Sequence, residues 1–93
     1  MTVQIPGEPI RVLFDWDYGY SSPLRAPEHI KHSLTQKLRD ELRAWLDVFE
    51  TGNPSDPGWP PLSWLAQGRT LKDRVQEELG PGFEVVFVLD RNR

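Results

Sequence analysis

Two short segments of alternating hydrophobicity, one near each end of the chain, constrain the fold most strongly. Residues 10–16 and 83–89 each place an apolar side chain at every second position, which is the period of a β-strand with one buried face. The apolar positions of that face are Ile10, Val12, Phe14 and Trp16 in the first segment and Phe83, Val85, Phe87 and Leu89 in the second. The chain therefore predicts a small sheet whose main strands come from opposite ends of the sequence.

Between these segments the apolar period changes to that of helices. Ser33 followed by Gln36 has the spacing of a capping box, and apolar side chains then recur at helical intervals as far as Gly52. Residues 52–61 are rich in proline and glycine, which predicts a connecting loop. A second helix is predicted to begin where this loop ends and to stop at residues 80–82, where glycine, proline and glycine follow one another.

The predicted element order is β-α-α-β, and the predicted fold class is α+β, with a small antiparallel sheet packed against a two-helix layer. One compact domain spans residues 1–93, and residues 1–9 and 90–93 are expected to be less ordered. If the helices form an antiparallel pair, the chain reverses direction three times and the two strands are antiparallel. Gly68 lies inside the second helix at a cost of about 1 kcal/mol relative to alanine, so we expect the other helix to approach closely there.

A sheet of two strands is marginally stable by itself. The face of the strands opposite the helices carries Leu13, Val86 and Val88 between charged residues, which is more apolar than a solvated face requires. We therefore expect that residues 2–5 add a third strand, or that a partner chain extends or covers the sheet. A structural homodimer with these three residues at the two-fold contact is one form of the second possibility.

The charge balance bears on the class of partner. The 14 acidic residues outnumber the 11 lysines and arginines, and the basic residues are spread along the chain rather than gathered in one stripe. Nucleic-acid binding requires a dense basic surface, so the sequence predicts no nucleic-acid partner. There is no cysteine and no apolar run of membrane-spanning length, and we expect a cytoplasmic protein without a membrane partner, a cofactor or a metal site.

A pair of carboxylates follows the first predicted strand. Asp15 and Asp17 stand two residues apart at its carboxyl end, in the order Val-Leu-Phe-Asp-Trp-Asp. This resembles the first motif of haloacid-dehalogenase-like phosphatases. The resemblance implies that Asp15 is a nucleophile toward phosphate and that Asp17 is a general acid and base. Gly19 occupies the position where that family usually has threonine, and the alternative reading is that the two carboxylates only cap a turn.

Five of the six tryptophans and tyrosines, namely Trp16, Tyr18, Tyr20, Trp59 and Trp64, lie in or beside two predicted loops, residues 15–24 and residues 53–64. Amphipathic aromatic side chains in loops either close the ends of a thin core or form binding hot spots. Interleaved carboxylates favour a basic protein partner. The candidate binding residues are Asp15, Trp16, Asp17, Tyr18, Tyr20, Asp56, Trp59 and Trp64.

The layout as a whole resembles a group of small proteins of high-GC bacteria. The shared features are a strand ending in Trp-Asp-Tyr-Gly, a following Ser-Pro-Leu, a first helix rich in leucine and tryptophan, a second helix that contains Gly-Arg-x-Leu and ends in Glu-Leu-Gly-Pro, and a last strand. The four motifs correspond here to Trp16–Gly19, Ser22–Leu24, Gly68–Leu71 and Glu78–Pro81. Small acidic proteins of this kind include immunity partners of secreted toxins. The resemblance thus implies a non-enzymatic protein-interaction module, of the immunity or antitoxin-like inhibitor type. A metal-dependent phosphoryl-transfer enzyme and a structural homodimer are the alternatives.

Overall fold

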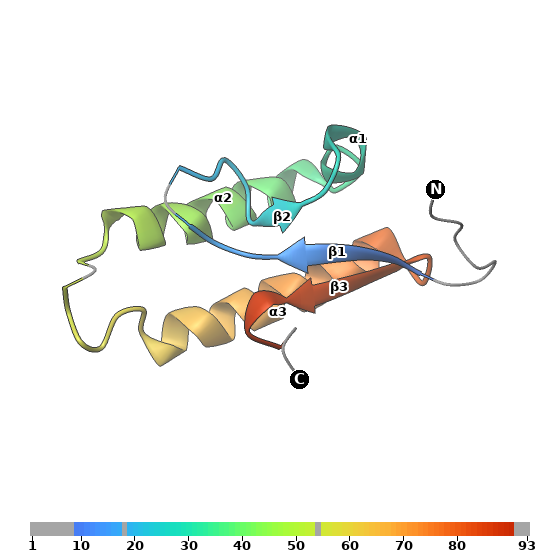
Figure 1. Cartoon of the computed structure of the whole chain (residues 1–93). Coiled ribbons are helices and arrows are strands. Elements are labelled where there is room, and N and C mark those ends of the chain that lie inside the picture. The colour runs from blue at the N-terminus through green and yellow to red at the C-terminus, as the bar shows by residue number, and fades with distance from the viewer. Residues whose placement is uncertain (1–8, 18, 54, 91–93) are drawn as a thin grey trace, which may run out of the picture.

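A computed structural model describes residues 9–17, 19–53 and 55–90 and has the α+β architecture that the sequence predicts (Figure 1). The expectations for residues 2–5 and for most of the two chain ends fall outside the described residues. Among those described, no helix combines the length and the apolar content needed to cross a bilayer. The elements in chain order are β1 (Ile10–Phe14), β2 (Leu24–Arg25), α1 (Glu28–Lys31), α2 (Gln36–Thr51), α3 (Leu62–Leu79), β3 (Phe83–Phe87) and the 3₁₀ turn η1 (Val88–Asp90).

The sheet is mixed, with the strand order β2-β1-β3. β1 pairs with β2 in antiparallel and with β3 in parallel orientation, so the prediction that the two main strands are antiparallel is wrong. The prediction is wrong because it treats the segment between β1 and α2 as a loop without a strand. That segment runs back along β1 as β2, and this additional reversal of the chain returns β3 to the direction of β1 (Figure 1).

Both long helices lie on one face of the sheet and form an antiparallel pair (Figure 1). Alternation along the strands directs Val12, Phe14, Val85 and Phe87 toward them, and all four side chains are buried. The helices complete this core with Leu38, Leu42, Trp45, Leu46 and Phe49 from α2 and Trp64, Leu71 and Val75 from α3. The predicted helix-covered face is therefore confirmed.

At Gly68 a side chain of α2 packs closely against α3, in line with the predicted close approach of the other helix. A Cβ atom built there would lie 2.5 Å from Cζ2 of Trp45 in α2 and 3.2 Å from Cε1 of Phe87 in β3. The indole of Trp45 thus occupies the space that any side chain at this position would need. The cost of glycine to the helix is offset by the packing of a large aromatic ring against its backbone.

The helix boundaries agree with the sequence at three ends and differ at the start of α2. Thr35, not Ser33, caps α2, because its Oγ1 accepts a hydrogen bond from the amide of Leu38 at 3.3 Å. Ser33 instead donates its hydroxyl to the carbonyl of Ile30 at 2.6 Å, next to the end of α1. Glu78 of α3 fixes the cap, since its carboxylate accepts from both the amide and the hydroxyl of Thr35, at 2.8 and 2.9 Å.

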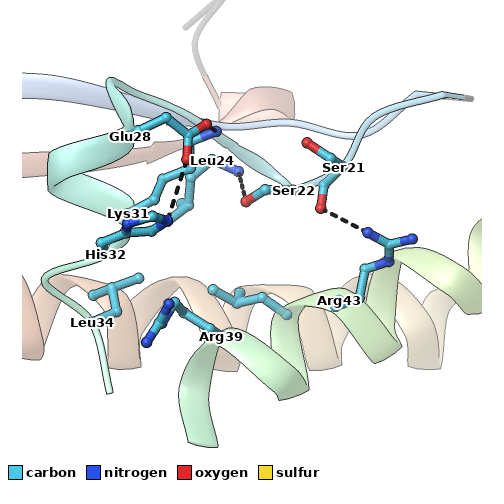
Figure 2. Close-up of a pocket in the computed structure, with 10 residues that line it drawn as sticks. Ser21, Ser22, Leu24, Glu28, Lys31, His32, Leu34, Arg39 and Arg43 are labelled. Carbon is cyan, nitrogen blue, oxygen red and sulfur yellow. Dashed lines mark hydrogen bonds and ion pairs between the residues drawn. The ribbon is translucent and has the colours of Figure 1, made fainter. Parts of the chain in front are cut away.

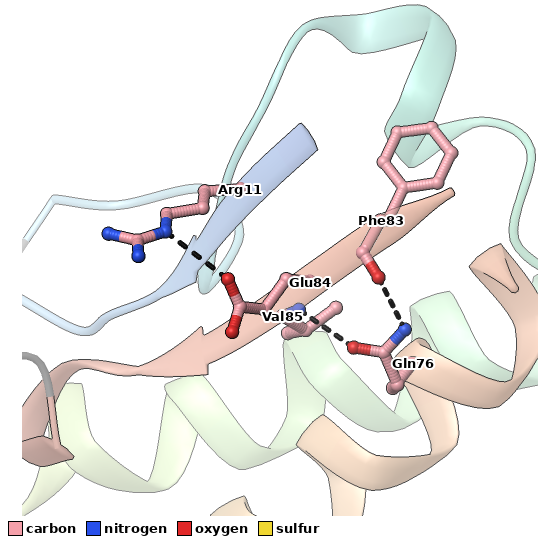
Figure 3. A network of polar contacts seen from close by, with 5 residues as sticks. All are labelled: Arg11, Gln76, Phe83, Glu84 and Val85. Carbon is pink, nitrogen blue, oxygen red and sulfur yellow. Dashed lines mark hydrogen bonds and ion pairs between the residues drawn. The ribbon is translucent and has the colours of Figure 1, made fainter. Parts of the chain in front are cut away.

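The outer edge of β3 is occupied in part by a side chain of α3 (Figure 3). The amide of Gln76 donates to the carbonyl of Phe83 at 2.7 Å and accepts from the amide of Val85 at 2.8 Å. These are the groups that a further strand would use, because the carbonyl of the preceding residue, Gly82, already pairs with β1. Gln76 therefore protects this part of the edge from strand addition.

Candidate functional site

Aromatic contacts connect the two loops that the sequence singled out. The loop between α2 and α3 extends past the C-terminal end of α2, whereas the loop after β1 lies alongside the C-terminal half of α2 (Figure 1). Trp16 of the first loop makes an edge contact with Trp64, at 5.3 Å between ring centroids. Phe49 lies between Trp64 and Trp59 of the second loop, at 5.4 and 6.2 Å. A continuous row of aromatic rings thus joins the two loops.

A pair of stacked indoles anchors this row in the core. The rings of Trp45 and Trp64 are parallel, with centroids 3.9 Å apart. Each indole nitrogen donates to the backbone carbonyl of the other residue at 2.9 Å. The pair therefore satisfies both of its polar atoms while it fixes α2 against α3. Trp64 is only 4% exposed, so it supports the site from below and offers no surface to a partner.

Trp16 and Trp59 are the outer members of the row, and each is half-buried. The Trp59 ring lies against the backbone of Gly52, so closely that a Cβ atom at Gly52 would overlap it. The indole nitrogen of Trp59 is buried and has no hydrogen-bond partner within the part of the chain that the structure describes. An unsatisfied buried donor is costly, and a partner that accepts this hydrogen bond would remove the cost.

The acidic residues of the loops shape the backbone as well as carrying charge. Oδ1 of Asp15 accepts from the amide of Trp16 at 2.7 Å, and Oδ1 of Asp56 accepts from the amide of Gly58 at 2.9 Å. The backbone carbonyl of Asp17 accepts from the amide of Tyr20 at 3.3 Å. Asp17 and Asp56 are exposed and Asp15 is half-buried, so the turns present carboxylates near the aromatic row.

This end of the molecule contains no basic residue in either contributing segment. Residues 12–24 and 44–68 have no lysine, arginine or histidine, although they contain several acids. We call this surface the acidic-aromatic end and define it by Asp15, Trp16, Asp17, Tyr20, Glu50, Asp56 and Trp59. Such a combination of half-buried aromatic rings with carboxylates fits the electrostatics of a basic protein surface.

The two tyrosines among the predicted binding residues are Tyr20 and Tyr18. Tyr20 is half-buried, packs against the core, and has the guanidinium carbon of Arg25 at 4.7 Å from its ring centroid. Its ring is thus partly occupied by an intramolecular cation–π contact. Tyr18, which the sequence also placed in the site, lies outside the described residues.

The face of the sheet away from α2 and α3 carries the residues predicted for a sheet or dimer contact. Leu13 of β1 and Val86 of β3 are register partners, and both are half-buried. The next pair along the strands is Arg11 and Glu84, which form an exposed ion pair at 3.2 Å (Figure 3). Val88 belongs to η1 rather than to a strand, so the predicted second strand is too long at its end.

The phosphatase-like reading requires a metal site near Asp15 and Asp17. Within the described ranges, no three histidine, cysteine, aspartate or glutamate side chains lie close enough together to hold a metal ion. The parallel pairing of β1 and β3 nevertheless places Asp15 just beyond the carboxyl ends of two parallel strands, the position at which α/β sheets bind ligands. His29 and His32 are exposed.

Sequence reasoning missed a pocket that lies between the β2–α1 segment and α2 (Figure 2). It has a volume of about 170 Å³. Its lining residues come from three segments, 21–24, 28–34 and 39–43, so no local sequence motif predicts the pocket. Four basic residues border it: Lys31 of α1, His32 directly after α1, and Arg39 and Arg43 of α2.

Compared with protein-family models, curated proteins and solved structures, the chain gives no match, and its function must be inferred from its own residues and fold.

Proposed function

We propose that this protein is a non-enzymatic protein-interaction module that binds a basic partner protein through the acidic-aromatic end. The class of function that the residues favour is an inhibitor of the immunity or antitoxin type. One observation carries the proposal: the row Trp16–Trp64–Phe49–Trp59 joins both loops, and the chain segments that form them contain acids and no bases.

The energetics of protein interfaces support this reading. Tryptophan is the residue most enriched at interface hot spots, and half-buried rings lose little conformational entropy on binding because packing already holds them. The stacked pair Trp45–Trp64 fixes the base of the row, so Trp16 and Trp59 are held before a partner arrives. The carboxylates around them would accelerate the encounter with a basic surface and disfavour acidic competitors.

The test compares capture of proteins from a lysate of the native host by the wild type and by two matched double variants. Glu50→Lys with Asp56→Asn removes negative charge from the acidic-aromatic end, and asparagine keeps the oxygen that accepts from Gly58. Glu77→Lys with Asp73→Asn changes the net charge equally on exposed positions of α3. Circular dichroism establishes that both variants are folded.

We expect the wild type and the α3 variant to retain the same basic protein and the loop variant to bind it at least about tenfold more weakly, the effect of about 1.4 kcal/mol. The affinity for the wild type should fall as salt is raised. Equal retention by the two double variants, or no specific protein retained by the wild type, would refute the proposal.

A second candidate is a metal-dependent phosphoryl-transfer enzyme that uses Asp15 and Asp17. The observation that favours it is the position of Asp15 at the carboxyl ends of the parallel pair β1 and β3. This function requires magnesium binding with loss of affinity in Asp15→Asn, and hydrolysis of a generic phosphomonoester. Calorimetric titration with magnesium and a chromogenic phosphatase assay measure both properties, and their absence would exclude this candidate without affecting the first.

A further inference from the structure

The pocket between the β2–α1 segment and α2 has a mixed lining that suits a small amphiphilic molecule. Its apolar wall consists of Leu24, Leu34 and Leu42, all of which are buried. Figure 2 shows Ser22, Glu28 and Lys31 on the β2–α1 side of the pocket and Arg39 and Arg43 on the α2 side. The volume of about 170 Å³ is below the roughly 300–1,000 Å³ of pockets that hold drug-sized ligands. The pocket therefore fits a polar head group with a few carbon atoms.

The charges on the lining are mainly positive. Lys31, Arg39 and Arg43 line the pocket together with His32, whereas Glu28 is its single acidic residue. Glu28 lies at the rim, where 73% of its side chain is exposed. It contacts Nζ of Lys31 at 3.0 Å and Nε2 of His32 at 3.4 Å. A hydrogen bond and the charge of Lys31 lower the pKa of Glu28, which reports a positive local potential.

Arg39 supplies the most specific observation. Its Nε is buried and has no hydrogen-bond partner in the part of the chain that the structure describes. A guanidinium carries five donors in a fixed planar arrangement that matches carboxylate and phosphate oxygens. Burying one of these donors without an acceptor is unfavourable, and an oxyanion bound in the pocket would supply the acceptor. No described carboxylate takes this role.

Further donors converge on the same space. Nη1 of Arg43 reaches the carbonyl of Ser21 at 3.4 Å, which holds its guanidinium against the opposite wall (Figure 2). Oγ of Ser22 accepts from the amide of Leu24 at 3.2 Å. A hydroxyl that accepts in this way keeps its own proton for another acceptor. Charged and neutral donors thus border the pocket on both its β2–α1 side and its α2 side, and three leucines form the apolar part of its lining.

We propose that this pocket binds a small organic oxyanion, a carboxylate or a phosphate ester, whose head lies between Arg39, Lys31 and Arg43 and whose short hydrocarbon part contacts Leu24, Leu34 and Leu42. The site is distinct from the acidic-aromatic end, and it does not depend on that surface for its function. A ligand bound here would connect α1 and β2 to α2.

Amide chemical-shift mapping by NMR with four probes tests the proposal. Butyrate and butyl phosphate present the two possible heads on the same hydrocarbon, inorganic phosphate lacks the hydrocarbon, and butylamine carries the opposite charge. We expect shifts confined to residues 21–24, 31–34 and 39–43, saturable with butyrate or butyl phosphate and weaker with inorganic phosphate. The tighter of the two organic anions identifies the head group. Saturable binding of butylamine, or no saturable binding of either organic anion, would overturn the proposal.

Matched variants connect the binding to the pocket. Arg39→Met keeps the aliphatic stem and removes the guanidinium, and we expect affinity to fall at least about tenfold for the loss of a charge-assisted hydrogen bond. Lys37→Met removes the same charge from an exposed position of α2 that does not line the pocket, and should bind as the wild type does. Lys31→Met provides a second pocket variant should Arg39→Met not fold. Equal affinity in the pocket and control variants would refute the proposal.

Discussion

At the scale of single residues, the packing of Trp45 against α3 determines why residue 68 is glycine. Its Cβ position is 2.5 Å from Cζ2 of Trp45, a ring atom that is held by stacking and by the hydrogen bond from Trp45 Nε1 to the carbonyl of Trp64. The ring cannot move away without breaking the indole pair. Glycine is therefore required at this position for steric reasons, not for backbone conformation.

We predict that Gly68→Ala destabilises the protein although alanine is the better helix former. Overpacking a well-filled core costs about 1–3 kcal/mol, which exceeds the gain of about 1 kcal/mol in helix propensity. The free energy of unfolding, measured by urea denaturation, should fall by up to about 2 kcal/mol as the difference of these effects. Gln67→Ala, at the exposed neighbouring position of α3, should change it by less than about 0.5 kcal/mol. A more stable Gly68→Ala variant would show that the indole pair yields easily.

Glu28 gives a pH-dependent prediction at the residue scale. Lys31 lowers the pKa of Glu28 by donating a hydrogen bond and by its charge, with a smaller contribution from the charge of His32. A lowered pKa in the folded state means that ionised Glu28 favours folding at pH values above the usual range for glutamate. This contribution, which solvent screening keeps small, is lost as the pH falls through the lowered value.

The measurement is an NMR titration of the Glu28 side-chain carboxyl carbon. Lys31→Met should raise the pKa of Glu28 toward its usual value. His32→Gln should raise it less, because the hydrogen bond to Lys31 remains. Equal rises in the two variants would contradict the assigned order of causes.

At the scale of the elements, Gln76 decides how the sheet ends. Its side-chain amide occupies the outward-facing carbonyl of Phe83 and amide of Val85 in the edge strand β3. Gln76→Leu keeps an apolar stem of similar size but leaves both backbone groups without this partner. We expect the variant to lose about 1–3 kcal/mol of stability and to aggregate faster, because an exposed edge can pair with another chain.

Light scattering during incubation near the unfolding midpoint measures the aggregation, and denaturation measures the stability. Gln67→Leu, an exposed glutamine in the same helix, is the control for added hydrophobicity. Faster aggregation of Gln67→Leu than of Gln76→Leu would mean that surface apolarity, not the β3 edge, governs association.

The elements themselves could largely be predicted from the sequence. Strong periodicity located both long helices and both main strands, and the glycine and proline signals fixed the limits of α3 at Pro61 and Gly80. The two-residue strand β2 has no periodicity to detect, and its omission made the direction of β3 wrong. The cap of α2 is Thr35 rather than the predicted Ser33, because Thr35 forms two hydrogen bonds with Glu78, which is distant in sequence.

The candidate site was predictable in its residues but not in their exposure. Loop position grouped Trp16, Trp59 and the acids as candidate residues, whereas nothing local shows that Trp64 forms reciprocal hydrogen bonds with Trp45 and is buried. The pocket around Arg39 could not be predicted, because β2, α1 and α2 create it only when they are assembled.

At the scale of the whole molecule, the exposed apolar residues are scattered rather than joined into one surface. Ile10, Val48, Leu62 and Leu89 are the large apolar residues exposed among those described, and they belong to four different elements. The open face of the sheet carries two further apolar residues, Leu13 and Val86, which are half-buried. The ion pair of Arg11 with Glu84 lies next to them on the same face. A stable dimer buries about 800 Å² per partner, and obligate homodimer contacts are more apolar than this face.

We therefore expect the purified protein to be a monomer. Size-exclusion chromatography with light scattering should give a mass near 10.8 kDa, independent of concentration. Leu13→Asp, which places a charge at the centre of the open face, should leave this mass unchanged. A species of twice the mass that Leu13→Asp converts to monomer would contradict the expectation and support the structural homodimer. A dimer that persists in Leu13→Asp but dissociates in Glu50→Lys would place self-association at the acidic-aromatic end instead.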